Sequence, residues 1–367
     1  HPHNRYAGCP IRGGSRTGHK RAMANTATET STTKPRQSNF ELLRIVTMLL
    51  VMITHAAFLT SGFPDRADFE ADPFGTVSLC AFQGFGVACV NIFVMISGWF
   101  GIKPSLKGFC NFLFQSFFYM WGIYLVLLLI GEWSIDIDRI RRSFGINSGY
   151  WFVGSYALLY ILSPVLNAFV KHATRRQMEL FLLAFFAFEI LYGWLLKDRT
   201  IDGGYTTISF VGLYILARYL HIYRSDLSRY GGRIVLWSTT IEILMICFLL
   251  YTGIPVHPTV YVAVPVIICA SGWILWCNTW KVPQSRIINF VAASAFAVYL
   301  IHVEPPYFLR ATHNFYDNLD GPAYVLACAA LLVVTYLIGI ILDQPRKWLW
   351  GLIARRFFPS QKTTLSE

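Results

Sequence analysis

The chain has 367 residues, of which 55% are hydrophobic and only 14% are charged, and its mean hydropathy is +0.47. These values exclude an ordinary soluble globular protein of this length. The formal net charge of +11 raises the question of nucleic-acid binding. However, the basic residues occur in short clusters between apolar runs, as loop charges do, and form no patch interleaved with aromatic residues. We therefore expect no nucleic-acid partner.

Residues 1–38 are rich in Thr, Ser, Arg and Gly and show no apolar period, so we expect a disordered basic tail, with Met23 as an alternative start. Beyond it, apolar runs of about 18 or more residues recur, which is the signature of bilayer-spanning helices. Residues 39–345 are expected to form an all-α polytopic transmembrane bundle. About ten spans are predicted, near 40–61, 77–99, 109–131, 151–170, 178–196, 205–220, 234–252, 259–279, 287–303 and 322–343. Residues 346–367 are expected to form a basic amphipathic tail on an anionic membrane face.

The distribution of basic residues predicts the orientation of these spans. Ten spans leave both ends of the chain on one side. If that side is the cytosol, most of the 31 lysines and arginines fall in the two tails and in the loops near 101–108, 171–177, 221–233 and 280–286. Cytoplasmic loops carry such an excess of Lys and Arg. We therefore expect both termini to be cytoplasmic and the chain to lie in the cell membrane, with the bacterial cytoplasmic membrane as the expected location.

The first span, FELLRIVTMLLVMITHAAFLT, contains Arg44 and His55. Ionisable groups inside a span are costly and are functional hypotheses by default. Eleven helical residues turn through about 1100°, about 20° past three full turns, so the two side chains share a face, with a rise of about 16 Å between them. Arg44 then marks the cytosolic edge, where a charge facing the headgroups is the alternative. A neutral imidazole is a general base near neutral pH, so His55 is a catalytic candidate.

The second span contains Asn91 among apolar residues and then Ser97 and Gly98. An amide and small residues at this spacing predict an interhelical hydrogen bond and close helix packing. Lys103 follows on the expected cytosolic side. Together with Arg44 and Arg218, it is expected to form a basic cluster suited to a phosphate-bearing ligand.

The late segment ASAFAVYLIHVEP places His302 at the outer end of the ninth span, one turn beyond Tyr299 and at a depth similar to that of His55. Glu189 and Glu242 lie deep in other spans, where interhelical hydrogen bonding is the alternative to a functional role. Asp343 lies near an inner helix end, where a charge that faces the headgroups and a functional role are the two alternatives. The eight cysteines include no CxxC pair, so we expect neither a metal site nor a disulfide.

Four segments, in this order and spacing, resemble the acyltransferase-3 family of integral membrane O-acyltransferases: RIVTMLLVMITH, VNIFVMISGWFGIK, YWFVGSYALLYILSPVLN and AFAVYLIHVEP. By position, Arg44 and His55 match the first-helix Arg and His of the family. Lys103 falls where the family has basic residues after the second helix. Tyr299 and His302 match its late tyrosine and histidine.

The sequence also departs from the family at two points. Asn91 stands where the family often has an aspartate. The acidic partner that some members use has no clear counterpart, and Glu132 and Glu189 are the candidates. The resemblance covers residues 39–345 and includes no extracellular hydrolase-like domain, so we expect a membrane-only member.

The resemblance implies transfer of an acyl group, commonly acetyl, from cytosolic acyl-CoA to a hydroxyl of a saccharide or glycan of the cell envelope. Arg44, Lys103 and Arg218 are then expected to bind the acyl-CoA phosphates. His55 is expected to act as the base or as a transient acyl carrier, and His302 to orient the acceptor or stabilise the oxyanion. Asn91, Tyr299 and Glu189 are expected to support the site. Two alternatives are a transporter of a small molecule or polysaccharide intermediate, and a scaffold in a polysaccharide-assembly complex.

Overall fold

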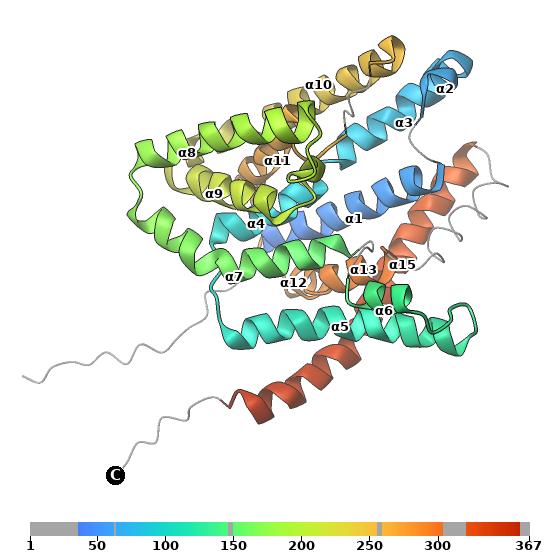
Figure 1. Ribbon diagram of the computed structural model, residues 1–367, viewed down its shortest axis with the longest axis vertical. Helices are drawn as coiled ribbons and strands as arrows, with labels where there is room; N and C mark the ends of the chain where they lie inside the picture. Colours follow the sequence, from blue (N-terminus) through green and yellow to red (C-terminus); the bar gives the residue numbers. More distant parts are fainter. Residues whose placement is uncertain (1–35, 62–63, 146–149, 255–258, 304–320, 360–367) are drawn as a thin grey trace, which may run out of the picture. The chain divides into compact units, whose positions relative to one another are not determined.

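A computed structural model describes residues 36–61, 64–145, 150–254, 259–303 and 321–359 (Figure 1). Regular structure in these ranges is helical. The elements are α1 (Ser38–Ser61), α2 (Arg66–Ala71), α3 (Pro73–Gly86), α4 (Cys89–Phe100), α5 (Leu106–Leu129), α6 (Ile137–Ser143), α7 (Trp151–His172), α8 (Arg175–Phe188), the π-helix η1 (Glu189–Leu195), the 3₁₀ turns η2 (Asp202–Gly204) and η3 (Ser225–Tyr230), α9 (Thr207–Tyr223), α10 (Gly231–Thr252), α11 (Val264–Cys277), α12 (Arg286–Ala292), α13 (Ala295–His302) and α15 (Gly321–Phe357). The basic tail expected over residues 1–38 lies almost wholly outside the described residues.

Within the described ranges, seven helical segments are long and apolar enough to cross a bilayer. They are Ser38–His55, Pro73–Phe100, Leu106–Leu129, Trp151–His172, Arg175–Leu195, Ser225–Thr252 and Ala329–Phe357. Each overlaps one of the ten predicted spans. The other three correspond to α9, with 17 residues, to α11, with 14, and to the interrupted pair α12 and α13. The count of ten spans and the cytoplasmic termini therefore stay predictions.

The chain before α11 explains why one predicted span is short. Residues 259–263 are apolar enough to extend the span, but their backbone is not helical. The N–H of Tyr261 instead donates to the carbonyl of Gly203 at 2.9 Å, next to the turn before α9. Irregular backbone at membrane depth is tolerated where it is buried in protein. An apolar pattern alone cannot distinguish such a segment from a helix.

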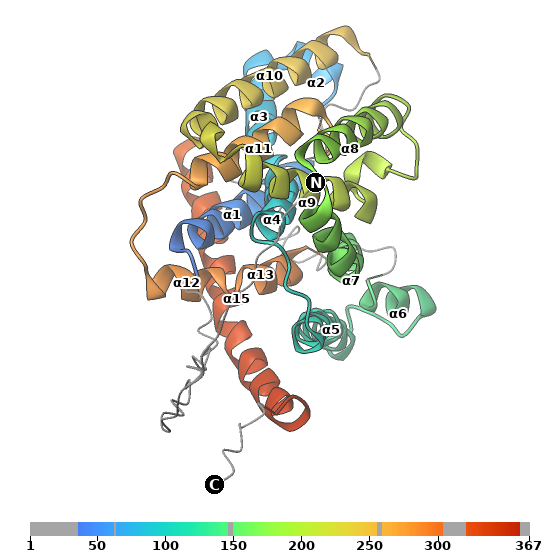
Figure 2. The ribbon, with the colours of Figure 1, turned by 90° about the vertical axis from the view of Figure 1, so that its left-hand side faces the viewer.

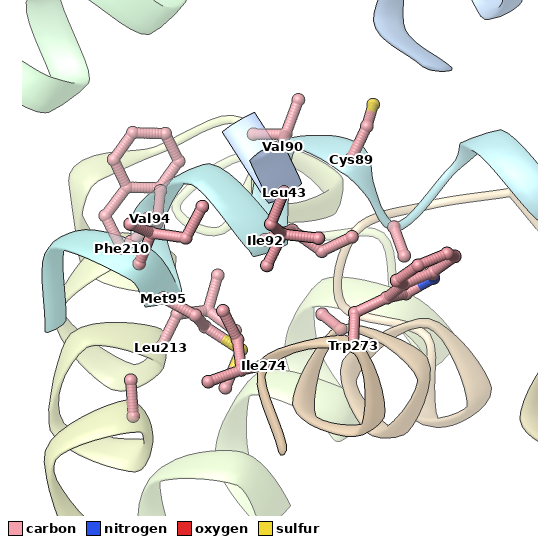
Figure 3. Packing of buried hydrophobic residues seen from close by; sticks show 14 of the residues in the cluster. Leu43, Cys89, Val90, Ile92, Val94, Met95, Phe210, Leu213, Trp273 and Ile274 are labelled. Carbon is pink, nitrogen blue, oxygen red and sulfur yellow. The ribbon is translucent and has the colours of Figure 1, made fainter. Parts of the chain in front are cut away.

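Helix α4 lies at the centre of the hydrophobic core and packs against α1, α9 and α11 (Figure 3). Most of its side chains are buried, including Ile92, Val94 and Met95. Gly98 allows α9 to approach closely, because a Cβ at this position would lie only 2.6 Å from the carbonyl oxygen of Tyr214. This contact confirms the close packing predicted at the end of the second span.

The outer faces of several long helices carry exposed large apolar side chains. Examples are Leu129 on α5, Leu183 on α8, Leu244 on α10 and Ile341 on α15. An exposed apolar surface of this extent is a liability in water but is the expected boundary with lipid. The packing therefore agrees with the composition, and both describe a multi-pass membrane protein.

The short helix α13 packs against α1, α5 and α15 (Figures 1 and 2). It has only eight residues and is separated from α12 by the break at Ala293 and Ser294. A helix of this length is marginal by itself in water, so its position depends on the helices around it. This matters because α13 ends with His302.

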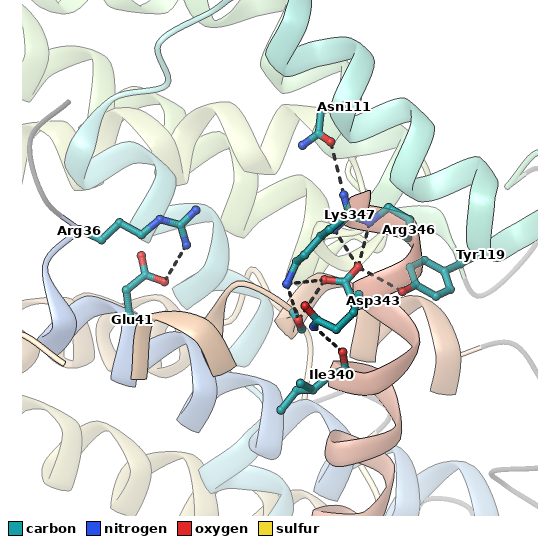
Figure 4. A network of polar contacts seen from close by, with 10 residues as sticks. Arg36, Glu41, Asn111, Tyr119, Ile340, Asp343, Arg346 and Lys347 are labelled. Carbon is teal, nitrogen blue, oxygen red and sulfur yellow. Dashed lines mark hydrogen bonds and ion pairs between the residues drawn. The ribbon is translucent and has the colours of Figure 1, made fainter. Parts of the chain in front are cut away.

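A buried ionic network centred on Asp343 joins α15 to α5 and to the start of α13 (Figure 4). The carboxylate is completely buried. Arg346 Nη2 lies 2.7 Å from Oδ1, and Lys347 Nζ lies 2.9 Å from Oδ2. The hydroxyl of Tyr119 donates to Oδ1 at 3.1 Å, and that of Ser294 donates to Oδ2 at 3.0 Å.

This network excludes one of the two alternatives for Asp343, a charge that faces the headgroups. The cations three and four residues later lie on the same helix face as Asp343, so the three charges pair inside the bundle. Helix α15 also runs on through Pro345 to Phe357. It thus includes the first part of the predicted amphipathic tail, and Arg346 is buried at 4% exposure.

Candidate active site

The two histidines that the sequence places at a similar depth are in contact. Helix α1 carries His55 and helix α13 carries His302, and 3.0 Å separates Nδ1 of His55 from Nε2 of His302. The ring centroids are 5.1 Å apart. His302 is buried, whereas His55 is only partly buried. The histidine pair therefore combines a ring fixed in the protein interior with a ring that keeps some accessible surface.

A contact within α13, one from the residue before α7 and one from α15 hold the α13 side of the pair. Nδ1 of His302 lies 2.7 Å from the carbonyl oxygen of Val298, one turn earlier in α13. The hydroxyl of Tyr150, which precedes α7, donates to the carbonyl of Leu300 at 3.1 Å. Lys347 of α15 donates to the hydroxyl of Ser294 at 2.9 Å, just before α13 begins. This short helix is thus anchored near both ends, through the Ser294 side chain at the start and the Leu300 backbone near the end.

Arg44 lies on the same helix as His55, three turns earlier. Its Nε is 3.7 Å from Oε1 of Glu41, an ion-pair distance that is too long for a hydrogen bond. In the part of the chain that the structure describes, this buried Nε has no hydrogen-bond partner. The side chain is nevertheless 33% exposed. A guanidinium with unused donors and some accessibility can bind a carboxylate or phosphate in two-point fashion.

An aromatic strip joins the level of Arg44 to the histidine pair. Arg44 is close enough to Tyr156 to interact with it electrostatically, and the Tyr156 hydroxyl is 3.0 Å from that of Ser97. Phe152 then stacks on Tyr156 at 5.6 Å and contacts Tyr299 at 5.7 Å. The Tyr299 ring meets His302 edge-to-face at 6.3 Å. The strip (Tyr156, Phe152, Tyr299) therefore forms a continuous wall from the Arg44 level to His302.

The other two basic residues lie at the same end of the bundle as Arg44. Phe40, one turn before Arg44, packs on Trp99 and Phe100 at the end of α4. Arg218 Nη1 donates to the carbonyl of Trp99 at 3.0 Å. Lys103 is exposed in the segment that follows α4. The fold thus brings this end of α1, α4 and α9 together.

Two of the expected supporting residues serve other contacts. Asn91 is buried and donates through Nδ2 to the carbonyl of Tyr261 at 2.8 Å, so it ties α4 to the chain before α11. Glu189 is buried at the start of the π-helix, next to Ser209 of α9. No hydrogen bond joins either residue to the histidine pair within the described ranges. Glu132, the other acidic candidate, is exposed. Also within these ranges, no group of three or more His, Cys, Asp or Glu side chains is placed to hold a metal ion.

Sequence reasoning missed the Ser97–Tyr156 contact and the aromatic strip. Tyr156 and Phe152 are four residues apart on α7, and Phe296 and Tyr299 are three apart on α13, so each pair shares a helix face. This spacing was readable. The sequence does not predict which helix each aromatic pair contacts, because aromatic residues at helical spacing are common in any apolar bundle.

Comparison with known proteins identifies the family. A family model described as an acyltransferase domain matches residues 37–343. No curated protein and no solved structure matches the chain. The matched range includes all four segments on which the resemblance rests, and it contains both histidines and Arg44. The chain therefore belongs to the acyltransferase-3 family and is a membrane acyltransferase.

Proposed function

We propose that the protein transfers an acyl group, expected to be acetyl, from cytosolic acyl-CoA to a hydroxyl of a saccharide or glycan of the cell envelope. The observation that carries the proposal is the 3.0 Å contact between His55 and His302, with Arg44 on the same helix three turns earlier. Imidazole is the side chain most often used as a general base. A guanidinium with unused donors suits the phosphates of a CoA thioester.

In this proposal the donor enters at the end of the bundle that carries Arg44, Lys103 and Arg218, called here the basic end. Arg44, Lys103 and Arg218 bind the CoA phosphates, and the pantetheine arm lies along the aromatic strip toward His55. The rise of about 16 Å between Arg44 and His55 is comparable to the length of that arm. Arg44 and His55 are both partly exposed on a largely apolar helix, which supports a path that a ligand can reach.

In the chemical step, His55 removes the proton of the acceptor hydroxyl while the hydroxyl oxygen attacks the thioester carbonyl. The carbon–sulfur bond breaks, CoA leaves as the thiolate and takes up a proton, and the acyl group stays on the acceptor as an ester. In a two-step variant, His55 first takes the acyl group on its ring nitrogen and passes it on. Both routes consume one acyl-CoA for each ester formed and need no other reactant.

The test uses purified protein in proteoliposomes, labelled acetyl-CoA, and glucose, N-acetylglucosamine or a glycan extract of the host cell as acceptors. We expect CoA release to depend on an acceptor and labelled ester to appear in equal amount. Release of CoA without any ester in the presence of these acceptors would contradict the proposal.

Transport is the second candidate, and buried acids favour it. Glu242 is 1% exposed, and neither of its carboxylate oxygens has a hydrogen-bond partner in the described part of the chain. Intramembrane carboxyl groups of this kind serve as proton carriers in pumps and transporters. Counterflow uptake of a labelled sugar into proteoliposomes without acyl-CoA would support transport. An uptake rate no higher than that of empty liposomes would remove this candidate.

A further inference from the structure

We infer that His302 is a positioning residue whose Nε2 accepts the Nδ1–H of His55, so that Nε2 of His55 is the basic atom. The catalytic consequence rests on the proposed function. The position of the proton on His55 does not, because it can be measured without any reaction.

His302 makes a hydrogen bond within its own helix. Nδ1 of His302 lies 2.7 Å from the carbonyl oxygen of Val298. A carbonyl oxygen can only accept a hydrogen bond, so this nitrogen carries a proton. A buried charge is costly, and the His302 ring is only 1% exposed, which favours the neutral ring. In a neutral ring with a proton on Nδ1, the other nitrogen, Nε2, has a lone pair and accepts.

The accepting Nε2 of His302 determines where His55 carries its proton. Nε2 of His302 accepts, and Nδ1 of His55 lies 3.0 Å away, so Nδ1 of His55 is the donor. The neutral ring of His55 then has its lone pair on Nε2. Among the residues that the structure describes, Nε2 of His55 has no hydrogen-bond partner, and the ring is partly exposed. The nitrogen left available is thus the one that can receive a proton.

This arrangement of protons affects how His55 acts as a base. When Nε2 of His55 takes a proton, the ring becomes a cation and its Nδ1–H donates more strongly to His302. His302 therefore has the place of the orienting group that holds the base in catalytic triads. Both ring nitrogens of His302 are engaged, one by Val298 and one by His55. This differs from the role first expected for His302, which was a direct contact with the acceptor or the oxyanion.

Two substitutions separate this positioning role from a role in proton transfer. The amide oxygen of His302→Gln can occupy the place of Nε2 and accept from His55, but an amide does not transfer protons at neutral pH. His302→Leu fills a similar volume without any acceptor. We expect His302→Gln to keep kcat within about 10-fold of wild type, and His302→Leu to lower it at least ~100-fold, since the wrong histidine tautomer in a Ser–His–Asp triad costs about 10⁴. His172→Gln, at the exposed end of α7, is the matched control and should change neither property.

Ring-¹⁵N-histidine solid-state NMR of the protein in proteoliposomes measures the tautomer directly. The His55 signals are assigned by their loss in His55→Asn. We expect a proton on Nδ1 of His55 in wild type and in His302→Gln, and its shift to Nε2 in His302→Leu. A proton on Nε2 of His55 in wild type would overturn the inference, as would equal loss of activity in His302→Gln and His302→Leu when both are folded.

The two arms also separate the inference from the proposed function. If wild type transfers no acetyl group while the tautomer of His55 follows the residue at position 302, the proposed function fails and the assignment of the proton stands. If wild type transfers acetyl groups while the tautomer of His55 is the same in all variants, the function stands and the inference fails.

Discussion

The histidine pair and the Asp343 network are both polar clusters inside the same apolar bundle. They differ in whether all of their polar atoms have hydrogen-bond partners. The Asp343 carboxylate is completely buried and accepts from Tyr119, Ser294 and two cations. By contrast, Nε2 of His55 and Nε of Arg44 have no hydrogen-bond partner in the described ranges, and both side chains are partly exposed. Polar groups whose hydrogen bonds are all made within the protein fix helices in place. Polar groups with an atom that lacks a partner are available to a ligand. The difference separates the framework of this bundle from its candidate active site.

The largest effect on activity is expected from a substitution in the histidine pair. General base catalysis contributes about 10²–10⁴-fold, so His55→Ala should lower kcat by that factor. Its thermal unfolding should stay close to that of wild type, since the side chain is only partly buried and gives up a single hydrogen bond. Acetyl transfer per folded molecule, measured in proteoliposomes, checks this. Transfer at the wild-type rate would remove His55 from the reaction.

The Asp343 network should show the opposite response. Asp343→Asn removes the charge that compensates Arg346 and Lys347, and breaking a buried ion pair in this way costs about 3–5 kcal/mol of unfolding free energy. Thermal unfolding in detergent measures the loss. Glu70→Gln, which removes an exposed partner of Arg66, is the control and should leave the unfolding midpoint unchanged. Equal midpoints for the two variants would mean that the network is not a stabilising anchor.

A smaller effect is expected at the basic end. Hydrogen bonds to charged groups contribute about 1.5–3 kcal/mol, so Arg44→Gln should raise KM for acetyl-CoA by roughly 10- to 100-fold. Here kcat should change much less, because the phosphates are distant from the chemistry. Initial rates over a range of acetyl-CoA concentrations distinguish the two parameters. An unchanged KM would exclude Arg44 from donor binding.

The smallest effect is expected at Lys103, which is exposed. Lys103→Glu should raise KM for acetyl-CoA by about 3- to 10-fold at low ionic strength, and added salt should reduce the difference because it screens exposed charges. Lys281→Glu, in another basic loop, is the control. If both variants raise KM equally, the effect comes from overall charge and not from a docking position.

The sequence was most informative where one helix carries the whole pattern. The spacing of Arg44 and His55 on α1 is local, and helical geometry alone places both on one face. The spacing of Asp343, Arg346 and Lys347 is local too. However, the buried network also needs Tyr119 and Ser294, which are 224 and 49 residues away from Asp343. The contact between His55 and His302 joins residues 247 positions apart. The similar depth of the two histidines was predicted from the order of spans. The geometry of their contact depends on how α1 packs against α13.

Other features were not predictable, because the same residues suit two structures. The apolar segment 259–263 is suited to a helix, but the hydrogen bond from Tyr261 to Gly203 keeps it irregular. Asn91 is suited either to support catalysis or to bind a neighbouring backbone, and its amide donates to Tyr261. In both cases the outcome depends on a tertiary partner that a single chain pattern does not identify.

The most direct test measures transfer and stability together for His55→Ala and Asp343→Asn, in the same preparations and per folded molecule. We predict that His55→Ala unfolds like wild type and loses at least ~100-fold in acetyl transfer. We also predict that Asp343→Asn unfolds at lower temperature, while its folded molecules transfer acetyl groups within about 10-fold of wild type. If folded His55→Ala transfers at the wild-type rate, or if folded Asp343→Asn loses as much activity as His55→Ala, the division between open site and structural anchor is wrong.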